Sequence, residues 1–353
     1  MQEWMTYLER AALEGASDVF LVPGAPVSYK LDGHLLPMDD RRVMPEQSKA
    51  YIEQIYAQAQ RDISPFLDAG DDDFSFSVAG LARFRVNVYR QRGSWAAVIR
   101  VVQFSVPDHA ELGIPEQVMA LAERTNGMVL VTGTAGCGKS TTLACIVDRI
   151  NQNRACHIVT LEDPIEYLHR NQKSIVSQRE VAVDTSDYLS ALRACLRQAP
   201  DVIQLGEMRD LETIRTAMTA AETGHLLLAT LHTKGAVNTI DRIIDAFPAD
   251  QQAQIRIQLS TVLCTVVSQQ LLPDVNGALV PAFEILQVNS AVRSMIRDSR
   301  NHLIPGAIAS GSQEGMISMD QSILELYRAG RITRETALNY CDNPEQLQRR
   351  MGG

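Results

Sequence analysis

The sequence predicts an α/β protein. Strand-like and helix-like segments alternate along much of its second half, and a phosphate-binding loop follows the first of those strands. Such alternation gives a parallel sheet that is covered on both faces and binds ligands at the carboxyl ends of its strands. The chain has 353 residues, more than one ordinary hydrophobic core accommodates, so we expect two domains.

The N-terminal domain, residues 1–105, is expected to be a small α+β unit. Gly15 is a typical helix stop, and Asp32-Gly33 is a hairpin signal. The strand at 82–91 alternates apolar residues with polar and cationic ones, which gives it one apolar and one partly cationic face. Helices are predicted at 2–14 and 45–59, and strands at 19–22, 27–31, 73–78, 82–91 and 95–103.

Residues 106–115 are expected to form a linker, because prolines and glycines interrupt regular structure there. The second domain is expected at 116–353, and its part from about 249 onward is expected to be a helical region with one interruption at 278–286. Before that region, strands are predicted at 128–132, 157–161, 202–206 and 226–231, and helices at 140–151, 186–198, 210–222 and 235–246.

The phosphate-binding loop fits the pattern G-x-x-x-x-G-K-[ST]. In this pattern, glycines turn backbone N–H groups toward phosphate oxygens, the lysine neutralises phosphate charge, and the hydroxyl holds Mg²⁺. The N-terminal dipole of the following helix adds to the same anion site. The loop predicts binding of a nucleoside triphosphate by Gly133, Thr134, Ala135, Gly136, Cys137, Gly138, Lys139, Ser140 and Thr141.

Composition narrows the class of protein. The net charge of −9 argues against a general nucleic-acid-binding surface, which needs a basic face. The N-terminus has no signal-peptide pattern and no apolar run approaches the length of a membrane span, so we expect a cytoplasmic protein. The six cysteines lack C-x-x-C spacing. We interpret Cys137 as a small residue that fills a tight turn; the alternative is a thiol whose modification blocks nucleotide.

Carboxylates follow the strand at 157–161. Glu162, Asp163 and Glu166 are placed to orient Mg²⁺-bound water or to accept its proton. The alternative is a solvated turn around Pro164.

Two further strands also end in candidate site residues. The strand at 202–206 has the character of a Walker B element, but Gly206 stands where a metal-coordinating Asp often lies, which leaves Glu207 as the carboxylate. His225 and His232 bracket the strand at 226–231 and suggest sensing of the γ-phosphate; the alternative is that they are structural.

The ordered segments GTAGCGKST, TLEDPIEY, VIQLGEMRD and TGHLLLATLHT resemble the Walker A, Asp-box, Walker B and His-box motifs of the secretion ATPase superfamily. Together with SQREV and DLETI, they resemble the PilT family of type IV pilus retraction ATPases along essentially the whole chain. The loop departs from the family at Thr134-Ala135 and Cys137, which is tolerable in a loop that binds through its backbone.

The resemblance implies a hexameric ATPase that uses ATP and Mg²⁺, with a PAS-like N-terminal domain and a RecA-like ATPase domain. Lys139 and Ser140 would bind the phosphates and Mg²⁺, Glu166 would be the general base with Asp163 in support, and Glu207 would be the Walker B carboxylate. His225 and His232 would couple nucleotide state to movement. Arginines of the N-terminal domain reach the nucleotide in this family, and Arg85 and Arg100 are the candidates here.

The segment 291–298 resembles the family's AIRNLIRE signature, which is associated with retraction. Ala291, Arg293, Ile296 and Arg297 match it, and a helix would bring the two arginines together at i, i+4.

The resemblance implies a motor for pilus depolymerisation and twitching motility. Its partners would be the other subunits of the hexamer, an inner-membrane platform protein at the inner face of the membrane, and a second retraction ATPase. An accessory retraction ATPase and a pilus-assembly or type II secretion ATPase are alternatives, although the latter usually carry a tetracysteine motif. A nucleotide-gated scaffold ring is an alternative of another class.

Overall fold

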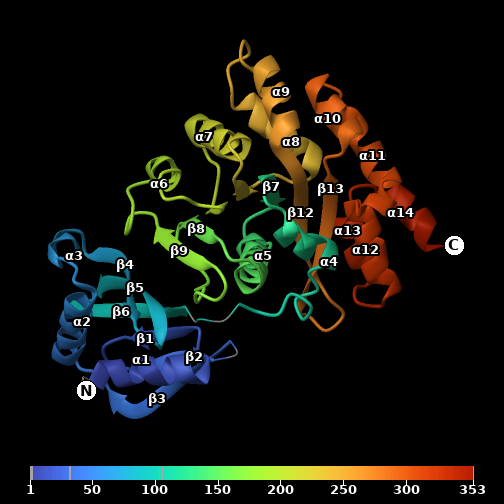
Figure 1. Ribbon diagram of the computed structural model, residues 1–353. Helices are drawn as coiled ribbons and strands as arrows, with labels where there is room; N and C mark the ends of the chain where they lie inside the picture. Colours follow the sequence, from blue (N-terminus) through green and yellow to red (C-terminus); the bar gives the residue numbers. More distant parts are fainter. Residues whose placement is uncertain (1–2, 32, 103, 105, 353) are drawn as a thin grey trace. The chain divides into compact units, whose positions relative to one another are not determined.

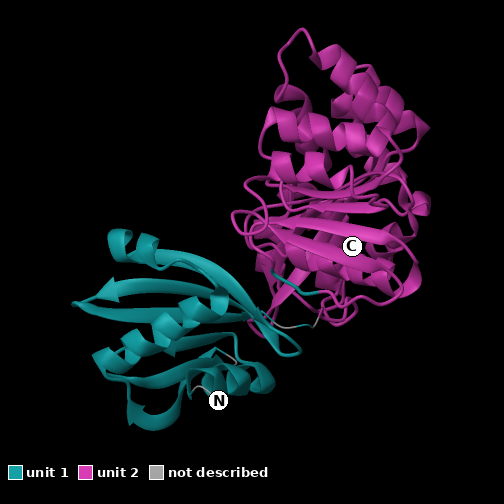
Figure 2. Cartoon of the chain, turned by 60° about the vertical axis from the view of Figure 1, so that its left-hand side comes forward, with its two compact units in different colours: residues 1–105, 166–168 teal, residues 106–165, 169–353 magenta. Residues whose placement is uncertain are grey.

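The computed structural model describes residues 3–31, 33–102, 104 and 106–352 (Figure 1). It divides into two compact units: unit 1 contains residues 1–105 and 166–168, and unit 2 contains residues 106–165 and 169–353 (Figure 2). The linker expected at 106–115 is wrong, because these residues belong to unit 2, where Ile114 is buried in the same hydrophobic cluster as Val118. The predictions for Gln2, Asp32, Gln103 and Ser105 lie outside the described residues.

Unit 1 is built on a six-stranded antiparallel sheet with the order β3-β2-β1-β6-β5-β4. Its strands are β1 (Asp18–Leu21), β2 (Pro26–Leu31), β3 (His34–Arg42), β4 (Asp71–Val78), β5 (Ala82–Gln91) and β6 (Ser94–Val102). Its helices are α1 (Glu3–Glu14), α2 (Pro45–Ala59) and α3 (Ser64–Ala69).

One face of this sheet forms the core of unit 1. The cross-strand neighbours Val19, Ile99 and Val86 are buried together with residues of α1 and α2. The alternation predicted for the strand at 82–91 is confirmed, since Val86 is buried and Arg85 is exposed. β3 was not predicted because it is a mostly exposed edge strand that contains Pro37, and edge strands tolerate proline.

Unit 2 is built on a seven-stranded sheet with the order β13-β12-β7-β11-β10-β8-β9. Adjacent strands are parallel except β13, which runs antiparallel to β12. The predicted α/β class with a parallel sheet is therefore confirmed. The strands are β7 (Gly127–Thr132), β8 (His157–Glu162), β9 (Ile175–Glu180), β10 (Val202–Leu205), β11 (Leu226–Leu231), β12 (Leu263–Pro273) and β13 (Leu279–Gln287).

Helices cover both faces of the larger sheet. Along β7, Met128 and Leu130 face one hydrophobic cluster, whereas Val129 and Val131 face another. This alternation explains why the strand is apolar at every position. The α-helices are α4 (Glu116–Met119), α5 (Lys139–Asn153), α6 (Tyr188–Cys195), α7 (Leu211–Glu222), α8 (Ala236–Asp245), α9 (Gln252–Val262), α10 (Ser290–Arg297), α11 (Ile304–Ser310), α12 (Met319–Arg328), α13 (Arg334–Tyr340) and α14 (Pro344–Met351). The short 3₁₀ helices are η1 (Ala120–Glu123), η2 (Asn301–Leu303) and η3 (Ser312–Glu314).

The helical region expected from about 249 onward is wrong at β12, which follows α9 directly and lies beside β7 inside the sheet. Its central residues Thr265, Val266 and Val267 are β-branched and buried, a composition that suits a strand covered on both faces. The interruption expected at 278–286 corresponds to β13. Among the described residues, no helix is long and apolar enough to cross a membrane.

Candidate nucleotide-binding site

The phosphate-binding loop connects β7 to α5 at the carboxyl edge of the parallel strands, which is where ligands bind in such sheets. Thr134, Ala135 and Gly136 are exposed, and Lys139 is buried as the first residue of α5. The exposed turn and the helix start together form the phosphate cradle that the pattern predicts.

The loop packs against Gln269 of β12, and this contact explains two of its glycines. A Cβ on Gly133 would lie 2.3 Å from the Gln269 carbonyl oxygen, and one on Gly138 would lie 2.8 Å from the Gln269 side-chain nitrogen. Both glycines also have positive φ, 142° and 89°. Gln269 in turn accepts a hydrogen bond from the Thr142 hydroxyl at 2.8 Å. β12, which was not predicted from the sequence, therefore packs directly against the phosphate loop through Gln269.

Lys139 is held by its own loop. Its Nζ donates to the carbonyl oxygens of Gly133 at 3.0 Å and Thr134 at 2.9 Å, and it lies 3.4 Å from Nδ1 of His232. A phosphate in the cradle would offer this ammonium a charged acceptor in place of neutral carbonyls, and charge-assisted hydrogen bonds are the stronger kind.

Glu207 and His232 meet at the same edge of the sheet. Oε1 of Glu207 lies 3.2 Å from Nε2 of His232, and Oε2 accepts a hydrogen bond from Nε of Arg209 at 2.6 Å. A continuous polar chain thus runs from Lys139 through His232 and Glu207 to Arg209. Arg209 was not predicted as a site residue, although it lies inside the VIQLGEMRD segment that resembles a Walker B motif.

Gly206 is required by its neighbour Tyr188. A Cβ at position 206 would lie 2.6 Å from the Tyr188 hydroxyl and 3.1 Å from the Leu161 carbonyl oxygen. An aspartate therefore does not fit at this position. Burial, and then the negative charge of Asp163, raise the pKa of the Tyr188 phenol well above its usual value, so this hydroxyl stays protonated.

His225 does not join this site. It precedes β11, whose amino end lies beside Gly127 at the start of β7, and its Nδ1 lies 2.9 Å from the Ala220 carbonyl oxygen. His232 follows the opposite end of the same strand, about 20 Å away at the usual rise per residue. His225 thus ties the end of α7 to the sheet and lies away from the phosphate loop of its own chain, so this geometry supports the predicted sensing role for His232 only.

The three carboxylates after β8 separate into two kinds. Glu162 is buried and accepts hydrogen bonds from the Thr160 hydroxyl at 2.6 Å and the Gln178 amide at 3.2 Å. Asp163 and Glu166 are exposed. Glu162 therefore has a structural place, whereas Asp163 and Glu166 are accessible to a ligand.

A cavity of about 250 Å³ adjoins the start of α5. It is lined by Glu111, Leu112, Ile114, Gly138, Thr141, Thr142, Gln269, Leu271, Leu279, Val280, Pro281 and Arg331. Its lining combines apolar side chains with polar groups beside the phosphate loop, a composition that suits the base and ribose of a nucleotide. The residues of the β12–β13 hairpin and Arg331 were not predicted as site residues, because they follow the phosphate-binding loop by more than a hundred positions and carry no motif.

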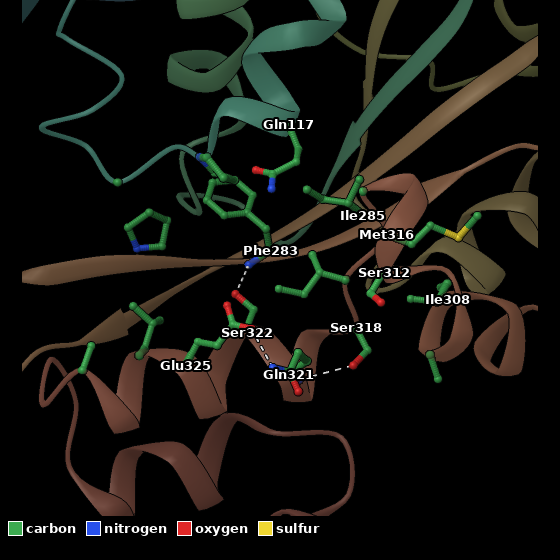
Figure 3. A pocket seen from close by; sticks show the side chains of 18 of the residues that line it. Gln117, Phe283, Ile285, Ile308, Ser312, Met316, Ser318, Gln321, Ser322 and Glu325 are labelled. Atoms are coloured by element: carbon green, nitrogen blue, oxygen red, sulfur yellow. Dashed lines mark hydrogen bonds between the residues drawn. The ribbon is translucent and has the colours of Figure 1, made fainter.

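A larger hollow of about 790 Å³ lies at the edge strand of the sheet (Figure 3). Its lining comes from the 113–117 segment, β13 and the C-terminal helices, and includes Phe283, Ile308 and Met316. The hydroxyl of Ser322 accepts the Phe283 N–H at 3.0 Å on one side of it. The hollow is two strands away from β7, so it lies apart from the phosphate loop.

Comparison with known proteins identifies the family. A family model described as type II/IV secretion system protein matches residues 2–313. PilT of Pseudomonas aeruginosa, a type IV pilus retraction ATPase, is 43% identical over 96% of this chain and 97% of its own length. The chain belongs to the PilT family of secretion ATPases.

Other members of the family match over most of their length. A twitching motility protein of Neisseria gonorrhoeae is 43% identical over 88% of this chain and 84% of its own. PilU of P. aeruginosa, a type IV pilus ATPase, is 38% identical over 95% of this chain and 87% of its own. A crystal structure of the pilus retraction motor PilT with bound ADP has a TM-score of 0.87 at 44% identity, covering 99% of this chain and all of that one. The predicted family and the ATPase class are confirmed.

In this PilT-family chain, the two candidate arginines of unit 1 are cross-strand neighbours on the polar face of the sheet. Arg85 is exposed and has no hydrogen-bond or ion-pair partner among the described residues. Nε of Arg100 is paired with Oδ1 of Asp18 at 3.0 Å. Together with Asp73, Asn87 and Val98 they line a hollow of about 240 Å³. Arg85 is thus the freer of the two guanidinium groups.

Cys137 is buried in the turn of the phosphate loop. A Cβ on Gly133 would lie 2.6 Å from its Sγ, so the thiol fills the inside of the turn. Burial raises the pKa of this thiol, and the positive charge of Lys139 only partly offsets that effect. These observations favour the interpretation of Cys137 as a packing residue.

The segment that resembles the retraction signature forms α10. Val292 and Ile296 are buried, whereas Ala291 and Arg297 are exposed. Arg293 donates to the carbonyl oxygen of Thr261 at the end of α9, at 3.3 Å. The helix and its faces agree with the sequence pattern.

Proposed function

We propose that this chain is a hexameric ATP-hydrolysing motor that powers type IV pilus retraction. The observation that carries the proposal is the polar chain from Lys139 through His232 to Glu207, with separations of 3.4 and 3.2 Å. It joins the Walker A lysine to the Walker B carboxylate through a histidine that also begins the connection to α8. The match to PilT along nearly all of both chains supports the assignment to retraction.

The nucleotide would be ATP with Mg²⁺. The residues fit this ligand, because Gly133 and Gly138 allow the tight turn of the loop against Gln269 and Lys139 supplies a buried positive charge. Ser140 would hold the ion, and Glu207 would hold water bound to it. Bound Mg²⁺ would neutralise charge that develops on the phosphates.

Glu166 would act as the general base and Asp163 would support it. Both side chains are exposed, in contrast to the buried Glu162 beside them. A base needs access to the attacking water, so exposure is consistent with this role.

Arg85 would stabilise the charge of the transferring phosphoryl group, and Arg100 would assist it. The absence of any partner for Arg85 among the described residues supports this assignment, because an exposed guanidinium outside an ion pair is available to a phosphate.

The partners of the motor would be the other subunits of its ring and a platform protein at the inner face of the cytoplasmic membrane. A second retraction ATPase would be a further partner, and the similarity to PilU is compatible with the chain itself being the accessory member of such a pair. The helix α10, with Ala291, Arg293, Ile296 and Arg297, would transmit movement for retraction.

Counting surface pili on cells that lack the gene tests the direction of the motor. Retraction predicts excess pili that fail to retract, whereas bald cells would contradict retraction and indicate pilus assembly. A scaffold ring is the alternative of another class, and it would bind ATP without turnover in a steady-state assay.

A further inference from the structure

The segment that carries Glu166 is attached to the sheet on both sides of that residue. Ile165 precedes Glu166, and His169 follows it by three positions. The backbone N–H groups of both residues are bound by side chains of a single strand, β9. Because the two attachments bracket so short a segment, they limit where the Glu166 carboxylate can go.

The attachment before Glu166 is made by Glu180. Its Oε2 accepts the Ile165 N–H at 3.1 Å, and the carboxylate is buried, with 4% of the residue exposed. The Glu180 backbone N–H is itself bound by Asp184 at 2.8 Å. A buried acceptor held in this way fixes the backbone more firmly than a solvated one, because no water replaces the bond when it breaks.

The attachment after Glu166 is made by Gln178. Its Oε1 accepts the His169 N–H at 2.8 Å, and its Nε2 donates to the buried carboxylate of Glu162 at 3.2 Å. The Thr160 hydroxyl donates to the same Glu162 oxygen at 2.6 Å. The hydrogen bond to Glu162 of β8 therefore orients the Gln178 amide so that its oxygen, and not its nitrogen, faces the His169 N–H.

The two-residue spacing of Gln178 and Glu180 on β9 explains why both side chains bind the same segment. Gln178 and Glu180 are two residues apart on a strand, so both side chains point to the same face. β9 is the edge strand beside β8, in parallel register with Glu162 opposite Glu180. The strand from which the segment departs and the strand that binds it are therefore neighbours.

We propose that Gln178 and Glu180 are positioning residues that hold the general base in place for ATP hydrolysis. The inference rests on the proposed role of Glu166 as that base. Neither residue needs to touch the nucleotide. They act through the backbone of residues 165–169, and small displacements of a base are costly to the rate of the chemical step.

The test compares Gln178→Ala, Glu180→Ala and Glu180→Gln in the full-length protein. Gln178→Ala is expected to lower kcat by about tenfold or more while the affinity for ADP changes by less than about twofold. Glu180→Gln retains an oxygen that can accept the Ile165 N–H, so it should keep much more activity than Glu180→Ala. Ser177→Ala is the matched control: it removes a side-chain contact from the opposite face of β9, at 3.0 Å from His157, and should leave kcat near the wild-type value.

Repeating the Gln178→Ala substitution in the Glu166→Gln protein distinguishes an effect on the position of the base from a general loss of structure. In Glu166→Gln protein, single-turnover hydrolysis should be no slower with Gln178→Ala added, because a misplaced base costs nothing once the base is gone. An equal further loss in that background would overturn the proposal, as would unchanged kcat for Gln178→Ala in the wild-type background. Full activity of Glu166→Gln alone would instead show that Glu166 is not the general base. The positioning role of Gln178 and Glu180 would then be overturned as well. Thermal unfolding of each variant confirms that the compared proteins are folded.

Discussion

Nε2 of His232 lies 3.2 Å from Oε1 of Glu207, while Nδ1 of the same ring lies 3.4 Å from Nζ of Lys139. The imidazole therefore contacts both the lysine of the phosphate-binding loop and the carboxylate that follows β10. Under the proposed function, movement of Lys139 toward a bound nucleotide would remove one neighbour of the ring, and recruitment of Glu207 to water on a bound Mg²⁺ would remove the other. Since His232 is followed within four residues by the start of α8, the ring is placed to pass these changes into the helical part of unit 2.

His232→Ala is expected to reduce ATP turnover by about tenfold or more, because it breaks the link between Lys139 and Glu207. His225→Ala is the matched control, since it replaces the other histidine that flanks β11 but lies at the amino end of that strand. We expect it to keep turnover near the wild-type value and to lower thermal stability slightly. Steady-state hydrolysis and thermal unfolding of both variants check this contrast. Equal losses of turnover in the two variants would contradict the placement of the histidines.

Gly206→Ala is expected to destabilise the protein by about 1–3 kcal/mol, because its Cβ would collide with the Tyr188 hydroxyl. Tyr188→Phe removes the oxygen that lies 2.6 Å from that position. The double variant should therefore recover part of the loss, although the ring carbon at 3.3 Å remains. Urea unfolding of the four proteins in this cycle measures the coupling. Strictly additive losses would show that Tyr188 is not the reason for the glycine.

Alkylation of Cys137 is expected to be slow at pH 8 and to accelerate as the pH rises beyond 9. Burial raises the pKa of this thiol, so the reactive thiolate forms only at higher pH than in an ordinary cysteine. Peptide mapping after timed treatment with iodoacetamide checks the order of reaction. The less buried Cys156 serves as the internal reference and should be labelled first. Preferential labelling of Cys137 at pH 8 would support the reactive-thiol interpretation instead.

Arg85→Ala is expected to lower ATP turnover by about tenfold or more without a measurable change in thermal unfolding, because the side chain is exposed and unpaired among the described residues. Arg42→Ala is the control, since it removes an exposed arginine from the end of the edge strand β3. Wild-type turnover in Arg85→Ala would make Arg85 an ordinary surface residue.

The four strands that carry the motifs could be predicted because each is a short, continuous apolar run followed by chemistry-bearing residues. β12 could not, since it follows α9 without a turn residue between them. β9 was not predicted either, because this edge strand is largely polar in sequence and only partly buried. These two strands lie beside the candidate site: β12 packs Gln269 against the phosphate loop, and β9 carries Gln178 and Glu180.

The sequence predicted which types of residue form the site more readily than it predicted which of several similar residues actually reach it. Glu162, Asp163 and Glu166 are equivalent as sequence, but only the hydrogen bonds from Thr160 and Gln178 show that the first is internal. His225 and His232 are likewise symmetric about a strand in sequence and lie at opposite ends of it in the fold. Because β11 runs parallel to β7, only His232 lies at the carboxyl edge that carries the phosphate-binding loop.

The most direct test of the account is hydrolysis by Glu166→Gln measured beside nucleotide binding. The substitution removes a base while preserving the size and polarity of the side chain, so ATP and ADP should bind as in the wild type. Turnover should fall by about a hundredfold or more, the range expected for loss of a general base. Near wild-type turnover with intact binding would contradict the account, because Glu166 would then not be the base of this ATPase.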